Sequence, residues 1–208
     1  MKVLGSDYKG LIFDVDGTIL DNMPTHYIAW KETCEKHGLH FSEKDFYAQA
    51  GVPTRTIVQR LCEAQNVTLD ITIEEFSHEK EAAYFKLPAH HSPAVSKVTA
   101  LIHEARKSNT PVALATGGTH VTVKHALEIV GLSPEDFNAI VTSHDVEHPK
   151  PAPDVFLAAA RGIGVDPKGI IAFEDSDLGM EAIGAAGMVA VDVRPWVIEQ
   201  REASQSEL

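Results

Sequence analysis

The sequence predicts an α/β fold, in which a parallel sheet is covered by helices on both faces and a separate helical module follows the first strand. Three observations lead to this prediction. Short apolar runs alternate with helical patterns from Pro93 onward, which is typical of parallel strands joined by helical crossovers. One further apolar run lies near the start, at Leu11-Ile12-Phe13. Residues 24–90 carry helical patterns and no strand pattern.

The first predicted strand covers about residues 9–14 and leads into Asp14-Val15-Asp16-Gly17-Thr18. Alternation along a strand places Asp14 and Asp16 on the same side. Two crowded carboxylates repel each other, and this cost is tolerable if a divalent cation lies between them or one carries a proton. Aspartate is also a common turn residue, so this stretch alone is compatible with a simple turn.

Residues 24–90 are predicted to form a module of helices. Pro24 can open a helix that ends at Gly38. Ser42, with Asp45 three residues on, has the pattern of a helix N-cap. Further helices are expected over 54–65 and 72–86. The predicted division is a core domain of residues 1–20 and 91–208 and a helical domain of residues 21–90.

The second half of the chain predicts the rest of the sheet. Helices are expected over 94–107, 119–130, 154–161 and 176–186, and strands over 111–115, 139–141, 169–173 and 188–191. The polar tail, 199–208, is expected to be frayed.

Composition narrows the class of protein. The 208 residues have 44% hydrophobic content, which is enough for a core, and a net charge of -12, which argues against binding nucleic acid or an anionic membrane. The apolar runs are shorter than a bilayer span, and no signal-peptide pattern is present. Cys34 and Cys62 lack metal-ligand spacing and are expected to be reduced. We therefore expect a cytoplasmic protein.

Chemically active side chains follow several of the predicted strands. In parallel α/β sheets, ligands bind beyond the carboxyl ends of the strands. The residues found there come from four separate segments: Asp14 and Asp16, Thr116, Lys150, and Glu174 with Asp175. Each alone is also typical of a turn, a solvated lysine or a helix N-terminus. Together they predict one shared site.

The acidic residues of this site suit a metal and a nucleophile. Carboxylate oxygens at Asp14 and Asp175, with Glu174 nearby, are the kind of ligand that Mg²⁺ prefers. A bound Mg²⁺ would offset the repulsion between Asp14 and an incoming phosphate. The Asp14 carboxylate could then attack phosphorus and form an aspartyl-phosphate.

The remaining residues suit phosphate binding and proton transfer. The Thr116 hydroxyl can donate to a phosphate oxygen, and Gly117 and Gly118 allow close approach of the backbone. Lys150 supplies a positive charge. Asp16 can protonate the leaving alkoxide and then deprotonate the attacking water.

These segments resemble the four motifs of the haloacid dehalogenase superfamily, in order and spacing. The matching segments are Asp14-Val15-Asp16-Gly17-Thr18, Thr116, Lys150-Pro151-Ala152-Pro153-Asp154 and Glu174-Asp175-Ser176-x-x-Gly179. The resemblance implies a Rossmann-like core and a mobile cap that closes over sugar phosphates. It also implies Asp14 as nucleophile, Asp16 as acid/base with its backbone carbonyl on Mg²⁺, Asp175 as a metal ligand and Glu174 as a direct or water-mediated one.

The inserted helical block resembles the cap of the beta-phosphoglucomutase-like branch. His26 matches a histidine of that branch and is expected to contact Asp16 or the substrate, and the turn from Gly51 to Arg55 resembles a cap loop that faces the active site. Mutases have a lysine where this chain has Ala50 and an asparagine where it has His120. Both departures argue against a mutase, because a cap with fewer cations holds a sugar bisphosphate poorly, and they favour a monophosphate hydrolase. The overall pattern, including the ending Asp192-Val193-Arg194, resembles small fructose-1-phosphate-type phosphatases. The substrate-binding residues expected are Thr116, Gly117, Lys150, His26, Gly51, Arg55 and His120.

The sequence therefore predicts a Mg²⁺-dependent phosphatase that acts on a small sugar phosphate. One alternative is a phosphosugar mutase with the same nucleophile. Another is a phospho-acceptor domain resembling a response-regulator receiver, although receivers place the acceptor aspartate midway along the chain and carry no cap. The expected partner is a small phosphorylated metabolite, and the chain is expected to be a monomer or a weak homo-oligomer.

Overall fold

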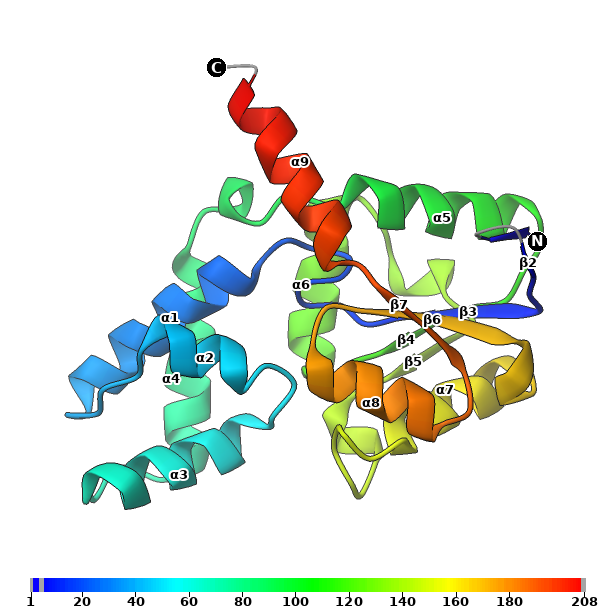
Figure 1. Ribbon diagram of the computed structural model, residues 1–208. Coiled ribbons are helices and arrows are strands. Elements are labelled where there is room, and N and C mark those ends of the chain that lie inside the picture. Colours follow the sequence, from blue (N-terminus) through cyan, green and yellow to red (C-terminus); the bar gives the residue numbers. More distant parts are fainter. Residues whose placement is uncertain (1, 4–5, 207–208) are drawn as a thin grey trace.

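A five-stranded parallel sheet lies at the centre of the computed structural model, which describes residues 2–3 and 6–206 (Figure 1). The strand order is β5-β4-β3-β6-β7, and each neighbouring pair is parallel. The strands are β3 (Gly10–Phe13), β4 (Val112–Ala115), β5 (Ala139–Val141), β6 (Ile170–Glu174) and β7 (Val189–Asp192). The predicted α/β fold with a Rossmann-like sheet is confirmed. Because β3 is the middle strand, the residues that follow it lie at the centre of the sheet edge.

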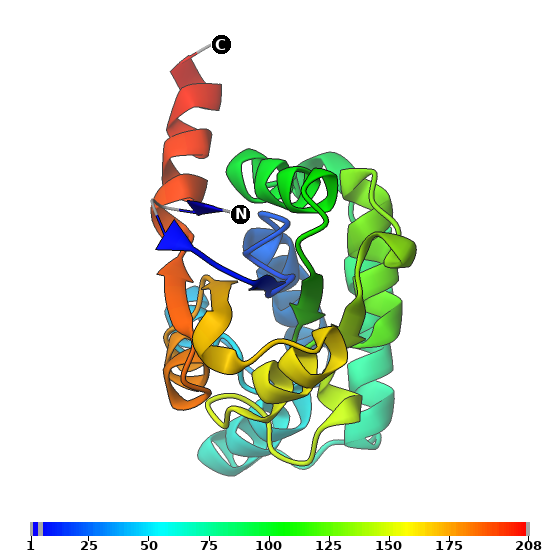
Figure 2. The same cartoon turned by 90° about the vertical axis from the view of Figure 1, so that its right-hand side faces the viewer.

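Helices cover both faces of this sheet (Figure 2). Leu11 and Phe13 of β3 pack into a cluster with α5 and α6, whereas Ile12 packs into a second cluster with α7 and α8. This alternation follows from the two-residue period of a strand, and it explains why all three residues are apolar. The helices are α5 (Ser96–Lys107), α6 (His120–Val130), α7 (Asp154–Ile163) and α8 (Asp177–Ala185).

Four helices between β3 and α5 form the helical module, by which we mean α1–α4. They are α1 (Met23–Lys36), α2 (Glu43–Ala48), α3 (Thr54–Gln65) and α4 (Ile73–Lys86). The module has its own hydrophobic cluster, built around Trp30, Phe46 and Phe76. The predicted N-cap at Ser42 is present, since its side chain accepts from the Asp45 amide, and Thr72 forms a capping box with Glu75 at the start of α4.

The remaining elements are short. They are β1 (Lys2–Val3), which pairs antiparallel with β2 (Ser6–Asp7), and the 3-10 turns η1 (Ala89–His91), η2 (Pro134–Asp136), η3 (Ser143–Asp145) and η4 (Pro167–Gly169). Cys34 is buried and Cys62 half-buried, and both are free thiols as expected. Within the described ranges, no helix combines the length and the apolar character that crossing a membrane requires.

The prediction of a frayed tail is wrong over residues 199–206. These residues belong to α9 (Arg194–Ser206), and residues 207–208 lie outside the described residues. Val197 is buried in the hydrophobic cluster that contains Leu11 and Phe13, and Trp196 packs against that cluster. Further along the helix, Gln200 and Arg201 bond to distant parts of the chain. The polar sequence therefore forms a helix because tertiary contacts hold one of its faces.

Candidate active site

The carboxyl ends of three neighbouring strands and one loop meet at a single pocket. Asp14 follows β3, Thr116 follows β4, and Glu174 ends β6 with Asp175 next to it. Lys150 reaches the same pocket from the loop before α7. The sequence-based expectation that these segments meet at one rim therefore describes the geometry correctly.

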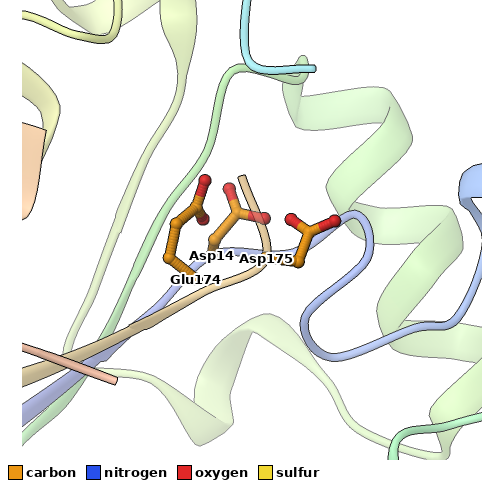
Figure 3. Close-up of side chains that lie close together, drawn as sticks. All are labelled: Asp14, Glu174 and Asp175. Atoms are coloured by element: carbon orange, nitrogen blue, oxygen red, sulfur yellow. The ribbon is translucent and has the colours of Figure 1, made fainter. Parts of the chain in front are cut away.

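Three carboxylates form the acidic part of the site (Figure 3). Asp14, Glu174 and Asp175 each offer an oxygen, and these oxygens lie within 4.8 Å of one another. Burial and the nearby Glu174 charge raise the pKa of Asp14 well above its ordinary value, although Lys150 opposes the shift. Burial and the charges of Glu174 and Asp14 raise the pKa of Asp175. An all-oxygen set with so much unneutralised charge is suited to a hard divalent cation.

Lys150 is the cation that faces this cluster directly. Its ammonium donates to Asp14 Oδ1 at 2.7 Å and to Glu174 Oε2 at 3.4 Å. Burial alone would lower the pKa of Lys150, but the two carboxylates outweigh it and raise the pKa, so the side chain stays charged. A charged, fixed lysine beside Asp14 can hold an anion against that carboxylate.

Two further residues fix the Glu174 carboxylate. The Ser176 hydroxyl donates to Glu174 Oε1 and accepts from the Gly179 amide at 3.1 Å, capping α8. A Cβ at position 179 would lie 1.7 Å from Glu174 Oε1, so only glycine leaves room for this carboxylate. The sequence places both residues in the fourth motif, but their effect on Glu174 was not predicted.

The turn after β4 forms one side of the pocket. Thr116 is 2% exposed, and its Oγ1 accepts from the Gly118 amide at 3.0 Å. Gly117 and Gly118 both line the pocket. A Cβ at Gly117 would lie 3.9 Å from the Gly51 carbonyl, so this turn and the helical module face each other closely. The backbone of this turn thus lines the pocket, and its contact with a phosphate stays a prediction.

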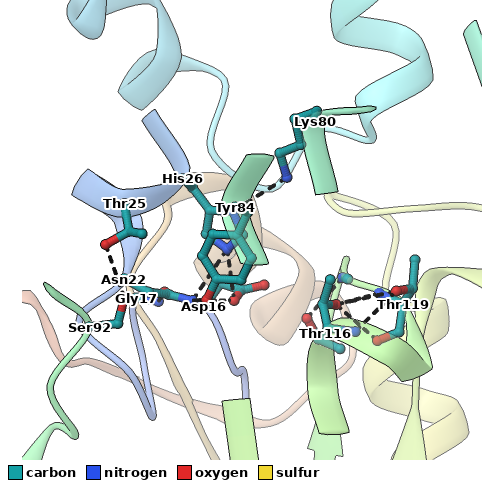
Figure 4. A network of polar contacts seen from close by, with 12 residues as sticks. Asp16, Gly17, Asn22, Thr25, His26, Lys80, Tyr84, Ser92, Thr116 and Thr119 are labelled. Carbon is teal, nitrogen blue, oxygen red and sulfur yellow. Dashed lines mark hydrogen bonds and ion pairs between the residues drawn. The ribbon is translucent and has the colours of Figure 1, made fainter. Parts of the chain in front are cut away.

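Asp16 is held by two side chains that follow it in the chain, Asn22 and His26 (Figure 4). Its Oδ1 accepts from Asn22 Nδ2 at 2.6 Å and lies 3.1 Å from His26 Nε2. Burial disfavours the charged form of Asp16, yet His26 and Asn22 outweigh that effect and lower its pKa to about 2. The expected contact between His26 and Asp16 is present. Asn22, which also accepts from the Gly17 amide at 2.9 Å, was not predicted.

Lys80 and Tyr84 extend this network into the helical module, and sequence analysis missed both. Lys80 Nζ lies 3.3 Å from His26 Nδ1, and the Tyr84 ring stacks on the His26 ring with centroids 4.1 Å apart. The four-residue spacing on α4 puts both side chains on one helix face, which is the signal the sequence offered. Ala50 leaves its loop without a cation, but Lys80 brings one to the pocket lining from α4, so the module carries more positive charge there than the sequence indicated.

The module supplies the other wall of the pocket, a cavity of about 150 Å³. Trp30, Phe46 and Ile57 give it an apolar surface, and Gln49 and Glu81 add polar groups. Such a wall can pack against the carbon skeleton of a small polar ligand and hydrogen-bond its hydroxyls.

The predicted substrate-binding residues divide into two groups. His26, Gly51, Thr116, Gly117 and Lys150 line the pocket. Arg55 and His120 are exposed and lie outside that lining, and His120 Nε2 is 3.4 Å from Asp145 Oδ2. A substrate-binding role for these two residues stays a prediction.

Residues 11–193 match the family model described as haloacid dehalogenase-like hydrolase. The chain belongs to this family. The haloacid dehalogenase-like assignment agrees with the four segments gathered at the rim, and the predictions of this superfamily and of a phosphoric monoester hydrolase are confirmed.

Known members of the family are similar over nearly the whole chain. The fructose-1-phosphate phosphatase YqaB of Escherichia coli is 38% identical over 187 residues, covering 90% of this chain and 97% of that protein. The beta-phosphoglucomutase of Bacillus subtilis is 29% identical over 191 residues, covering 89% of this chain and 83% of that protein. The crystal structure of CbbY from Rhodobacter sphaeroides in complex with phosphate has a TM-score of 0.80 at 23% identity, covering 88% of this chain and 84% of that one, and it supports the fold.

Proposed function

We propose that the protein is a Mg²⁺-dependent phosphatase that hydrolyses a small sugar phosphate through an aspartyl-phosphate on Asp14. One observation carries the proposal. Asp14 lies buried between two other carboxylates and the Lys150 ammonium, in a pocket whose opposite wall is the helical module. The similarity to a protein named fructose-1-phosphate phosphatase supports the same substrate class.

The acidic cluster fits the proposed metal. Asp14, Glu174 and Asp175 offer only carboxylate oxygens, which Mg²⁺ prefers. Burial and the neighbouring carboxylate charges raise the pKa values of Asp14 and Asp175, and a divalent cation would offset those charges. These residues would hold the ion, with the Asp16 backbone carbonyl expected to join them. When bound, Mg²⁺ supplies positive charge where a phosphoryl group meets Asp14.

The protein's own groups account for the two chemical steps. Asp14 attacks phosphorus, the bond from phosphorus to the sugar oxygen breaks, and the departing alkoxide takes a proton from Asp16. Water then attacks phosphorus, Asp16 takes its proton, and Asp14 is released with inorganic phosphate. Lys150, Thr116 and the Gly117 backbone hold the phosphoryl oxygens during both steps.

The position of Asp16 adds a condition to the first step. With its pKa lowered to about 2, Asp16 is ionised while Asn22 and His26 hold it. Asp16 must therefore leave these partners and take up a proton before it can protonate the alkoxide. The same arrangement ties the acid/base residue to the helical module, because His26 lies on α1 and meets Lys80 of α4.

The pocket favours a compact substrate with one phosphate. Its volume is small, and the module wall is mainly apolar, with Gln49 and Glu81 available to sugar hydroxyls. Lys80 is the module cation in the lining, and it already faces His26 and the Trp30 ring, 5.7 Å away. A second phosphate would therefore find little unshared positive charge on this wall.

A screen of phosphate release over a panel of phosphorylated metabolites, with Mg²⁺ and with EDTA, tests the proposal. We expect turnover of a sugar monophosphate that EDTA abolishes, and acid-quenched protein that carries phosphate on the peptide containing Asp14. Glucose 1-phosphate with a catalytic amount of bisphosphate separates the mutase alternative. Isomerised product without free phosphate would overturn the hydrolase assignment.

A further inference from the structure

The C-terminal helix α9 lies against the place where the chain crosses between the sheet core and the helical module (Figure 1). The chain crosses twice, through residues 20–22 before α1 and residues 92–95 after η1. Any change in the width of the pocket between core and module must bend the chain at these two linkers. A residue that grips a linker can therefore influence the pocket from a distance.

The two linkers are bonded to each other. The Asp21 amide donates to the Pro93 carbonyl at 2.9 Å, and the Val95 amide donates to the Ile19 carbonyl at 2.8 Å. They consequently form one short ladder, and a constraint on either linker acts on both.

Two neighbouring residues of α9 grip this ladder. Gln200 donates to the Ala94 carbonyl and accepts from the Ser96 amide, each at 2.8 Å. Arg201 makes two hydrogen bonds to the Asp21 carboxylate, from Nε to Oδ2 at 2.6 Å and from a terminal nitrogen to Oδ1 at 2.5 Å. Asp21 is only 5% exposed, so its carboxylate depends on this partner for its charge compensation.

Arg201 also faces the helical module. Together with Tyr47 of α2 it lines a second cavity, of about 330 Å³, which lies beside the active-site pocket and shares Ala50 and Asp175 with it. Tyr47 and Arg201 line this same cavity, and Tyr47 is 41% exposed. One arginine thus bonds to the first linker and lines a cavity whose other wall includes Tyr47 and Ala48 of the module.

We propose that Arg201 is a positioning residue, which holds the linker through Asp21 and the module through Tyr47 and so sets how far the active-site pocket opens. Arg201 lines the second cavity and not the active-site pocket, so it acts on turnover only through the module. The inference rests on the proposed function for its kinetic consequence, but not for its structural one.

The kinetic test compares two substrates. Acetyl phosphate is small enough to react at the rim without contacting the module wall, whereas the best sugar phosphate of the panel needs that wall. We expect Arg201→Ala to raise KM for the sugar phosphate about tenfold, because the two-point grip on Asp21 is lost. We expect kcat/KM for acetyl phosphate to stay within about twofold of wild type, because the rim is untouched.

Three further variants make the result specific. Arg201→Lys keeps the charge but not the two-point contact, so KM should rise less than in Arg201→Ala. Tyr47→Phe removes the module side of the contact, and adding it to Arg201→Ala should change nothing more. Glu199→Ala is the matched control on the same helix. It breaks an exposed pair with Lys97, two residues before Arg201 in the chain, and should leave both substrates unaffected.

Hydrogen exchange gives a readout that needs no activity. Arg201→Ala should speed exchange at the Asp21 and Val95 amides, while Glu199→Ala should not. Unchanged exchange in Arg201→Ala would overturn the inference whatever the enzyme does. Equal losses on both substrates, or no kinetic change at all, would also overturn it. A wild-type protein that hydrolyses neither substrate would refute the proposed function alone, and exchange would still decide the role of Arg201.

Discussion

Replacing Gly179 by alanine should inactivate the enzyme without weakening the helix that carries it. Alanine normally stabilises a helix by about 0.5–1 kcal/mol relative to glycine. Here the new Cβ would lie 1.7 Å from Glu174 Oε1, where contacts under 3.0 Å are essentially never found, so the carboxylate must retreat by about 1.3 Å. Glu174 is 1% exposed and bonded to Ser176 and Lys150, so it cannot move without breaking those contacts.

A displacement of this size predicts a large kinetic effect. Misplacing a functional group by 1 Å typically costs about a hundredfold in rate, or about 2.7 kcal/mol in transition-state stabilisation. We therefore expect kcat/KM of Gly179→Ala to fall about a hundredfold, with a weaker apparent affinity for Mg²⁺. Steady-state phosphate release over a Mg²⁺ titration measures both quantities.

The same helix offers a matched control. A Cβ at Gly184 would meet no atom within 4 Å, so Gly184→Ala should keep wild-type activity and raise Tm by about 1–4 °C. Wild-type kinetics and Mg²⁺ affinity in Gly179→Ala would refute the reasoning, because Glu174 would then have no role at the position the structure gives it.

Three other outcomes are expected. Asp14→Asn should abolish turnover and leave Tm near that of wild type, since shape is kept and the nucleophile is lost; residual turnover above a few per cent by phosphate release would contradict the assigned role. Because the pKa values of Asp14 and Asp175 are raised in the fold, the protonated carboxyl groups contribute to the stability of the metal-free protein below about pH 4. This contribution is lost as pH rises through the raised pKa values. Mg²⁺ at about 100 times its Kd should therefore raise Tm by about 5–10 °C near neutral pH and by less at about pH 5, as a thermal melt would show. Ala50→Lys adds a cation to the pocket lining and should shift preference towards bisphosphorylated sugars by about tenfold; an unchanged substrate profile would mean that this loop does not contact the substrate.

Local sequence signals located most of the fold. The capping box of Thr72 with Glu75 and the N-cap at Ser42 mark helix starts that the structure reproduces, because these hydrogen bonds join residues only three apart. The short apolar runs predicted parallel strands correctly, since both faces of such a sheet are buried and polar residues cannot be accommodated there.

The rim of the active site was also predictable, for a topological reason. Parallel strands present their carboxyl ends to the same edge, so Asp14, Thr116 and Glu174 had to meet once the strands were identified. The exact order of the strands matters little for this meeting point. The resemblance to the family motifs implies a role for each residue there.

The tertiary structure alone decided three features: the helix at the C-terminus, the cation from α4 and the contact of Asn22 with Asp16. Arg201 bonds to Asp21 across 180 positions of sequence, and Lys80 meets His26 across 54. The pattern of one element can put side chains on a shared face, as it does for Lys80 and Tyr84, but the partner they meet depends on how separate elements dock. The sequence by itself therefore determined which side chains stand at the catalytic rim, while docking of the helical module and α9 decided which side chains surround and position them.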